Sequence, residues 1–185
     1  MTSDVDQLVS RIAIEDAIKR DCRAVDRCDW DLLASVYHED AAIEHGLFSG
    51  GVDGMVDFVR SRRVGIRHTA HYVSNVLVDF AGPDNAVCET YGWASQTFVP
   101  PSPFVPEGMA ATRITSMFRY VDRFERRDGR WAIAEATLVT GERESRHYPD
   151  APPDATAAVV QQPSMDDPLY ALLARTGTRH QGGSA

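Results

Sequence analysis

The chain has 185 residues, 43% of them hydrophobic and 25% charged, which fits one globular domain and excludes a disordered or fibrous chain. Its formal net charge of -8 argues against a nucleic-acid partner, because phosphate binding needs a basic face, and against binding to an anionic membrane surface. No apolar run approaches the roughly 20 residues of a membrane-spanning helix. The acidic, polar start is unlike a signal peptide. The odd number of cysteines fits no disulfide framework, so we expect reduced thiols in a cytoplasmic protein.

The first third of the chain predicts three helices and one strand. Apolar residues such as Leu8 and Ile12 recur at helical spacing, and Asp29 is placed to cap the second helix, which carries Tyr37. Ser49-Gly50-Gly51 reads as the turn that closes the strand. The helices are expected over residues 4–27, 30–37 and 53–62, with the strand at 41–48.

The rest of the chain up to Gly141 changes to the pattern of strands. Asp128-Gly129 is the strongest hairpin signal, and the Pro- and Gly-rich stretch at 100–111 reads as a long loop. The four expected strands cover residues 70–80, 86–99, 113–126 and 130–141. We therefore expect an α+β, cone-shaped roll in which the helices pack on one face of a curved, mixed, mostly antiparallel sheet. Such a roll encloses an apolar pocket between the helices and the sheet.

The C-terminal part is expected to be an extension of this cone. We place the cone domain at 1–147 and the extension at 148–185. The extension holds a short amphipathic segment at 167–175, and its end at 177–185 is predicted to be disordered. An apolar stripe from Leu169 to Leu173 would otherwise be left in water, so we expect it to pack on the protomer or on a neighbour.

Asp26 is the most informative residue of the first helix. It continues the four-residue track of Ile14, Ile18 and Cys22, which places its carboxylate on the buried face. A buried carboxylate needs a partner. The alternative is that Asp26 caps the turn between helices, but Asp29 already serves as that cap, so the functional interpretation is favoured.

Two histidines are candidate partners or substrate contacts. His71 begins the strand after the third helix and shares a face with Val73, Asn75 and Leu77, although a lone strand histidine is more often structural than catalytic. The opposite face is assigned to Tyr72, Ser74, Val76 and Val78. An aspartate that orients an imidazole fixes its tautomer and leaves the other nitrogen free to take a proton. His45 shares a face with Ile43, and a pocket role and a half-exposed edge position are equally open for it.

Metal binding is not expected. The three cysteines, Cys22, Cys28 and Cys88, have neither a zinc spacing nor an even count for disulfides. His68 and His71 lie on opposite faces of one strand, and residues 38–40 (HED) fall at a helix end where such side chains are usually solvated. The residues expected to line the pocket and bind substrate are Tyr37, Ile43, Tyr91, Trp93, Phe98 and Met117.

With these residues in place, the chain resembles the SnoaL-like branch of the nuclear transport factor 2-like superfamily over the run from Val5 to Gly141. The segments that carry the resemblance are 11–16 (RIAIED), 24–26 (AVD), 29–35 (DWDLLAS), 39–41 (EDA), 69–72 (TAHY) and 125–131 (ERRDGRW). Asp26 and His71 match the Asp-His positions of its cofactor-free lyases, two dehydratases and a dehydrochlorinase. The resemblance implies a homodimer or homotrimer, no cofactor, and a small hydrophobic, ring-bearing substrate from whose acidic carbon His71 removes a proton.

The chain also departs from those lyases. His45 falls where the two dehydratases place a tyrosine, Asp21 stands where one of them has a tyrosine, and residues 136–140 lack the arginine found on the final strand, the next positive charge being Arg143. Dehydration, retro-aldol loss of a carbonyl such as formaldehyde, and isomerisation therefore all fit. Two non-catalytic alternatives are the small subunit of an aromatic-ring dioxygenase and a small-ligand binding protein. The Asp26–His71 pairing counts against the first, and the second needs no base.

Overall fold

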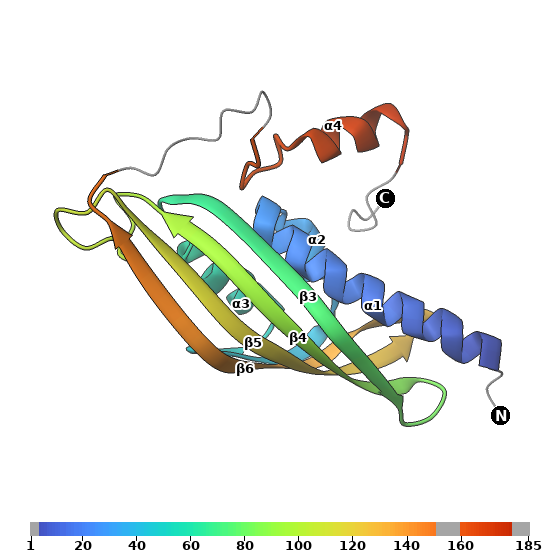
Figure 1. Cartoon of the computed structure of the whole chain (residues 1–185). Coiled ribbons are helices and arrows are strands. Elements are labelled where there is room, and N and C mark those ends of the chain that lie inside the picture. Colours follow the sequence, from blue (N-terminus) through green and yellow to red (C-terminus); the bar gives the residue numbers. More distant parts are fainter. Residues whose placement is uncertain (1–3, 151–159, 179–185) are drawn as a thin grey trace.

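The computed structural model describes residues 4–150 and 160–178 and has the predicted α+β class (Figure 1). None of the described helices is long and apolar enough to cross a membrane. The elements in chain order are α1 (Asp4–Arg27), α2 (Trp30–Ser35), β1 (Tyr37–His45), β2 (Phe48–Gly50), α3 (Val52–Ser61), β3 (Ile66–Phe80), β4 (Asn85–Phe98), β5 (Ala111–Arg127), β6 (Arg130–Tyr148) and α4 (Pro168–Arg175).

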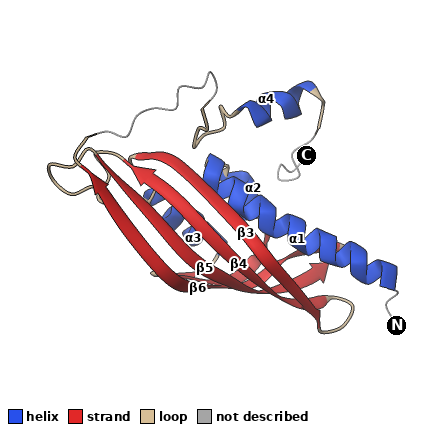
Figure 2. Ribbon diagram, viewed as in Figure 1, coloured by secondary structure: helices blue, strands red, loops and turns tan. Residues whose placement is uncertain are grey.

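Within the described residues, six strands form one open, curved sheet in the order β2-β1-β6-β5-β4-β3. Only β1 and β6 pair in parallel, and all other neighbours are antiparallel, which confirms a mixed, mostly antiparallel sheet. Figure 2 shows the helices α1, α2 and α3 together on one side of the red sheet. Because the sheet curves around these helices, the residues between them form the core and the pocket.

α1 has the bounds that the helical spacing predicted, but most apolar side chains of its first turns are exposed. Ile14 and Ile18 lie in the core, whereas Leu8 and Ile12 are 57% and 60% exposed. Leu8 and Ile12 fall at the helical spacing that predicted α1, but they lie outside the core.

The first strand is longer than predicted and the second was missed. β1 begins at Tyr37, which was assigned to a helix, because Tyr37 already pairs with Ile133 of β6. The turn after β1 is at Gly46 and Leu47, where Gly46 has a φ of 65°, and β2 then returns alongside β1 over the segment expected to be the turn. β6 likewise continues to Tyr148, seven residues beyond Gly141, because its end pairs with the start of β5.

A bulge at Asn75 reverses the two faces of β3. Asn75 has a φ of 47°, and the pairing with β4 shifts between Ser74 and Val76. Because of this extra residue, Val78 is buried on the same side of the sheet as His71. The predicted alternation was correct up to Val73 and wrong beyond Asn75, since a single residue in the left-handed region is invisible to a pattern of period two.

α4 lies against the end of α1 and beside β3 (Figure 1). Asp167 caps it by accepting a hydrogen bond from the backbone N–H of Leu169, and the Oδ2 atom of the same Asp167 lies 2.9 Å from Nε of Arg27. Oη of Tyr170 donates to Asp29 over 3.0 Å. Asp167 and Tyr170 therefore hold the segment on its own protomer, but no residue of α4 is buried and Leu172 is 50% exposed, so packing of the whole apolar stripe stays a prediction. The disorder predicted for residues 177–185 falls almost wholly on 179–185, outside the described residues.

Candidate active site

A cavity of about 460 Å³ lies between the helices and the concave face of the sheet. Its apolar wall comes from all three layers of the fold, with Ile18 of α1, Met55 and Phe58 of α3, and Phe98 and Ile114 of the sheet. Its polar side chains include His71, His45, Asp21 and Asp122. A cavity of this size with an apolar wall and a few titratable groups is typical of a site for a small organic molecule.

Asp26 and His71 meet at one side of this cavity. Helical phase directs Asp26 from α1 toward β3, where Oδ1 of Asp26 lies 2.6 Å from Nδ1 of His71. The same Oδ1 accepts a hydrogen bond from Oγ1 of Thr69 over 3.0 Å, and Oδ2 accepts one from the backbone N–H of His71 over 2.8 Å. One carboxylate therefore holds both the ring and the strand segment that carries it.

These bonds decide the charge of Asp26. Burial raises the pKa of its carboxyl, but the hydrogen bonds from His71 and Thr69 outweigh burial, and the net pKa lies below the ordinary 3.8. Asp26 is thus an anion at neutral pH, so Nδ1 of His71 carries the proton in their hydrogen bond. Nε2 of His71 has no hydrogen-bond partner among the described residues, and the ring borders the cavity and contacts Phe118, with centroids 6.2 Å apart.

His45 lies on the wall of the same cavity, at the end of β1. Its ring contacts the ring of Phe58 at a centroid distance of 6.4 Å. Burial lowers the pKa of His45 below 6.5, so the imidazole is neutral at pH 7. A neutral imidazole can donate one hydrogen bond and accept another, which suits contact with an oxygen atom of a bound molecule.

The other residues expected to line the pocket lie in different parts of the fold. Tyr37 and Phe98 do line the cavity, whereas Ile43 is buried in the core and is not part of the wall among the described residues. Tyr91 and Trp93 lie on the outer face of the sheet and are 45% and 39% exposed. Met117 touches the rim of the cavity, but its side chain also belongs to the outer face and is 55% exposed.

The phase of β4 explains the misplaced aromatic residues. Ala94, Gln96 and Phe98 point into the cavity, so the odd-numbered Tyr91 and Trp93 must point outward. Gly92 lies opposite Phe118 of β5, and a Cβ atom at position 92 would collide with that ring. An inward position for Phe98 also places the other even-numbered residues of β4 on the inner face. Aromatic character alone does not show which side of the sheet a residue faces.

Two further carboxyl groups lie in the cavity: Asp21, which the sequence analysis named only as a departure from the dehydratases, and Asp122, which it did not name. Asp21 is buried on α1, accepts a hydrogen bond from Oη of Tyr37 over 2.9 Å, and has its pKa raised by burial to about 6. Asp122 is buried on β5, and burial together with the nearby Asp21 raises its pKa well above 3.8. The alternation of Phe118, Tyr120 and Asp122 along β5 would have placed Asp122 on the inner face.

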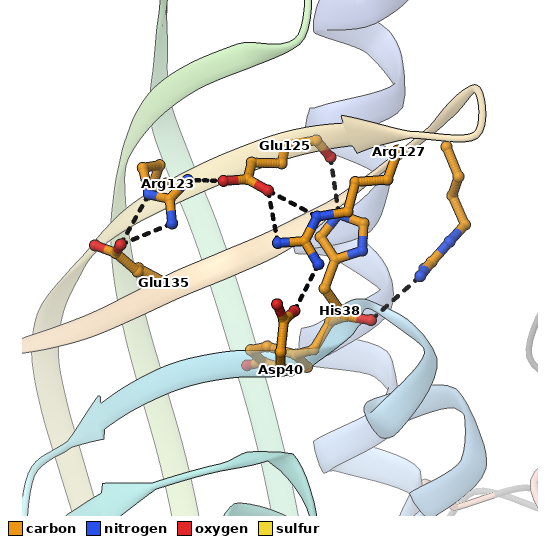
Figure 3. A network of polar contacts seen from close by, with 8 residues as sticks. His38, Asp40, Arg123, Glu125, Arg127 and Glu135 are labelled. Atoms are coloured by element: carbon orange, nitrogen blue, oxygen red, sulfur yellow. Dashed lines mark hydrogen bonds and ion pairs between the residues drawn. The ribbon is translucent and has the colours of Figure 1, made fainter.

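His38 and Asp40, which had raised the question of a metal cluster, belong to a separate network of polar contacts (Figure 3). They lie in β1, not at a helix end. Nε2 of His38 donates to the backbone carbonyl of Glu125 over 3.0 Å, and Oδ1 of Asp40 lies 2.6 Å from Nη1 of Arg127. Both side chains are thus occupied in joining β1 to the hairpin of β5 and β6.

Comparison with known proteins places the chain in context. A family model described as the SnoaL-like domain matches residues 6–137. Gamma-hexachlorocyclohexane dehydrochlorinase of Sphingobium indicum is 29% identical over 143 residues, which cover 75% of this chain and 85% of that protein. The crystal structure of LinA superposes with a TM-score of 0.69 at 25% identity and covers 83% of this chain and all of that one.

A further solved structure, of a candidate scytalone dehydratase from Novosphingobium aromaticivorans, has a TM-score of 0.67 at 22% identity and covers 84% of this chain and 99% of that chain. At this identity the likeness shows the fold alone. The two solved structures therefore share the cone-shaped fold of this chain.

Proposed function

The chain belongs to the family of SnoaL-like domains, and on this premise we propose that it is a cofactor-independent lyase acting on a small hydrophobic, ring-bearing molecule. The observation that carries the proposal is the hydrogen bond between Asp26 and His71 at the wall of an apolar cavity. The dehydrochlorinase with which the chain shares 29% identity is a lyase by its name.

In the proposed reaction His71 is the base. Asp26 holds Nδ1 in its protonated form, so the lone pair of Nε2 takes a proton from an acidic carbon of the substrate. The electron pair of that C–H bond forms a double bond to the next carbon, and the leaving group departs from it with its own bonding pair. The ionised Asp26 stabilises the imidazolium that forms, because an anion lies 2.6 Å from its Nδ1.

The cavity wall supports a hydrophobic substrate. Phe58, Met55 and Phe98 offer apolar and aromatic surface for a ring, and His45 offers a neutral donor to an oxygen atom on that ring or beside it. In this reading Tyr37, Phe98 and the rim residue Met117 contact the substrate, whereas Tyr91 and Trp93 do not, because their side chains point away from the cavity.

The proposal is tested with the full chain and a panel of ring alcohols and aryl-propanoid diols, followed by mass spectrometry. Loss of water indicates dehydration, loss of formaldehyde indicates retro-aldol cleavage, and a product of unchanged mass with a new retention time indicates isomerisation. His71→Gln removes the base and is expected to abolish any of the three. If the wild type turns over no compound, and His71→Gln binds ligands with the same affinity as the wild type, the chain is a binding or structural protein.

A further inference from the structure

Asp21 and Asp122 border the same end of the cavity as Tyr37 and Tyr120, and their two carboxyl groups have no role in the reaction described so far. All four side chains border the cavity. Asp21 and Asp122 are 8% and 4% exposed, whereas aspartate side chains in proteins are mostly exposed to water. Two buried carboxyl groups in one apolar cavity cannot both be ionised without a large cost in free energy, since like charges and burial oppose ionisation together.

Asp122 has an incomplete set of hydrogen bonds. Its Oδ1 atom is fully buried and has no hydrogen-bond partner among the described residues. The backbone N–H of Thr137 on the neighbouring strand donates to the carboxyl group. A carboxyl group in this setting is complete only if it is protonated and donates its O–H to an acceptor, and the described residues offer no such acceptor.

The surroundings of Asp122 keep its proton in place. The titratable groups near enough to interact with its charge are all acids: Asp21 and Cys22 of α1, Tyr37 of β1, Cys88 of β4 and Tyr120 of β5. Arg62, Arg63 and Arg143 also border the cavity, but the pKa of Asp122 is set by burial, by Asp21 and by the Thr137 backbone, and no cation lowers it. Asp21, whose pKa is about 6, is the carboxyl group that ionises first, and its charge then holds the proton of Asp122 more firmly.

We propose that Asp122 is a second catalytic residue, a neutral carboxylic acid that donates a hydrogen bond and then a proton to an oxygen atom of the substrate. The inference rests on the proposed lyase function and narrows the substrate class to molecules with oxygen at the reacting end, such as a β-hydroxy ketone. A chloride leaving group needs no proton. A neutral acid at Asp122 therefore assists the departure of an oxygen leaving group and gives no such assistance to a halide.

The elimination is balanced as follows. Nε2 of His71 takes the proton from carbon, the C–H electron pair becomes the new C=C bond, and the C–O bond breaks with its pair going to oxygen. That oxygen takes the proton of Asp122 and departs as water. The imidazolium of His71 then returns its proton through water to the Asp122 carboxylate, so no other reactant is consumed.

The first test measures the proton on Asp122 without any turnover. Infrared spectra of the wild type at pH 7.5 are compared with those of Asp122→Asn, which has nearly the same shape but no acidic proton. We expect a carboxylic-acid C=O band that is lost in Asp122→Asn and kept in Asp79→Asn, a matched variant at an exposed position of β3. A spectrum in which Asp122→Asn removes no such band would overturn the proposal.

The second test measures the hydrogen bond to ligand oxygen. β-Tetralone and tetralin have the same two rings and differ in one carbonyl oxygen. Asp122→Val lacks a donor, and we expect it to reduce the preference for β-tetralone over tetralin by about 10-fold relative to wild type. Asp79→Asn is expected to keep the wild-type preference, and an unchanged preference in Asp122→Val contradicts the role of Asp122 as donor.

These two measurements separate the inference from the function on which it rests. His71→Gln should keep both the infrared band and the preference for β-tetralone while abolishing turnover. If the band and the preference are found but His71→Gln has no effect on turnover, the lyase mechanism is wrong and the oxygen site stands. If His71→Gln abolishes turnover but neither signal depends on Asp122, the lyase stands and the acid is not Asp122.

Discussion

The carboxylate of Asp26 binds His71 twice, through Nδ1 of the ring at 2.6 Å and through the backbone N–H at 2.8 Å. The second bond matters as much as the first, because it fixes the strand as well as the ring. A side chain from the end of α1 thereby sets the position of a base on β3, forty-five residues later in the chain. The orientation of the base thus depends on the packing of helix against sheet.

Replacing Asp26 with asparagine should separate orientation from folding. The amide keeps a similar shape and still accepts hydrogen bonds with one atom, but it cannot stabilise the imidazolium of His71. We expect the rate of turnover on an active substrate of the panel to fall on the order of 10²- to 10⁴-fold, while the far-ultraviolet circular dichroism stays that of the wild type. Asp79→Asn is the control, and equal rates in Asp26→Asn and Asp79→Asn would show that Asp26 does not assist the base.

The raised pKa of Asp21 predicts a pH dependence of stability. The pKa of Asp21 is about 6 in the folded state, against an ordinary value of 3.8, so the folded state binds this proton more tightly than the unfolded state. The stability that the bound proton contributes is complete below pH 3.8 and is lost as the pH rises to about 6. Asp21→Asn should therefore gain about 2 to 3 kcal/mol in unfolding free energy relative to wild type between pH 4 and pH 7.

Urea unfolding at several pH values measures this difference. Asp26 has a lowered pKa and acts in the opposite direction, adding stability above pH 3.8 that is lost as the pH falls through its folded pKa. That contribution is present in both proteins and cancels in the comparison. Parallel pH profiles for wild type and Asp21→Asn would contradict the burial of an acidic proton at Asp21.

His45 is expected to titrate below its ordinary range. Burial opposes the charged imidazolium, so the midpoint of His45 in a proton NMR titration should lie below 6.5. His45→Gln keeps a donor and His45→Phe does not, so only the phenylalanine variant should weaken the binding of β-tetralone. Equal weakening by both variants would indicate that His45 contributes shape and not a hydrogen bond.

If Asp122 donates a proton to the leaving group, the effect of replacing it on the reaction rate should depend on which group leaves. The aldol adduct of benzaldehyde and acetone and its β-chloro analogue both give benzylidene acetone on elimination, which is followed by its ultraviolet absorbance. Asp122→Asn should slow loss of water on the order of 10²-fold or more and change loss of chloride by much less. His71→Gln should slow both reactions, and release of benzaldehyde from the hydroxy compound would instead identify retro-aldol cleavage.

The outer face of the sheet predicts self-association. The rings of Tyr72 and Trp93 lie 5.5 Å apart on that face, beside the exposed Met117 that pairs with Trp93 across β4 and β5. An apolar patch of this kind on a sheet is commonly covered by another subunit, and we expect a homodimer or homotrimer in light scattering. Trp93→Glu should shift the mass toward the monomer, and a wild type that is already monomeric contradicts the prediction.

Much of the fold could be predicted because local rules agree with it. The spacing of Ile14, Ile18 and Asp26 gave both the length of α1 and the direction of the carboxylate, since a helix repeats regularly. Asp128 and Gly129 form the expected hairpin turn with φ angles of 52° and 79°. In both cases the geometry depends only on residues that are close together in the sequence.

The parts that were missed depend on distant pairing. The bulge at Asn75 shows only in the register of β3 against β4, and the early start of β1 follows from its parallel pairing with β6. Asp21 and Asp122 come together because α1 packs across the concave sheet, and neither residue by itself marks such a contact. The acidic end of the cavity therefore emerged only when the sheet and the helix were placed together.

The central claim is that Nε2 of His71 removes a proton from carbon, and hydrogen–deuterium exchange tests it most directly. β-Tetralone has an acidic CH₂ group between its aromatic ring and its carbonyl group. Exchange of these two protons for deuterium in D₂O removes their signal from the proton NMR spectrum. The wild type should accelerate exchange well above the rate in buffer, and His71→Gln should return it to that rate. Exchange at the buffer rate in a wild type that binds β-tetralone, or equal acceleration by His71→Gln, would contradict the account.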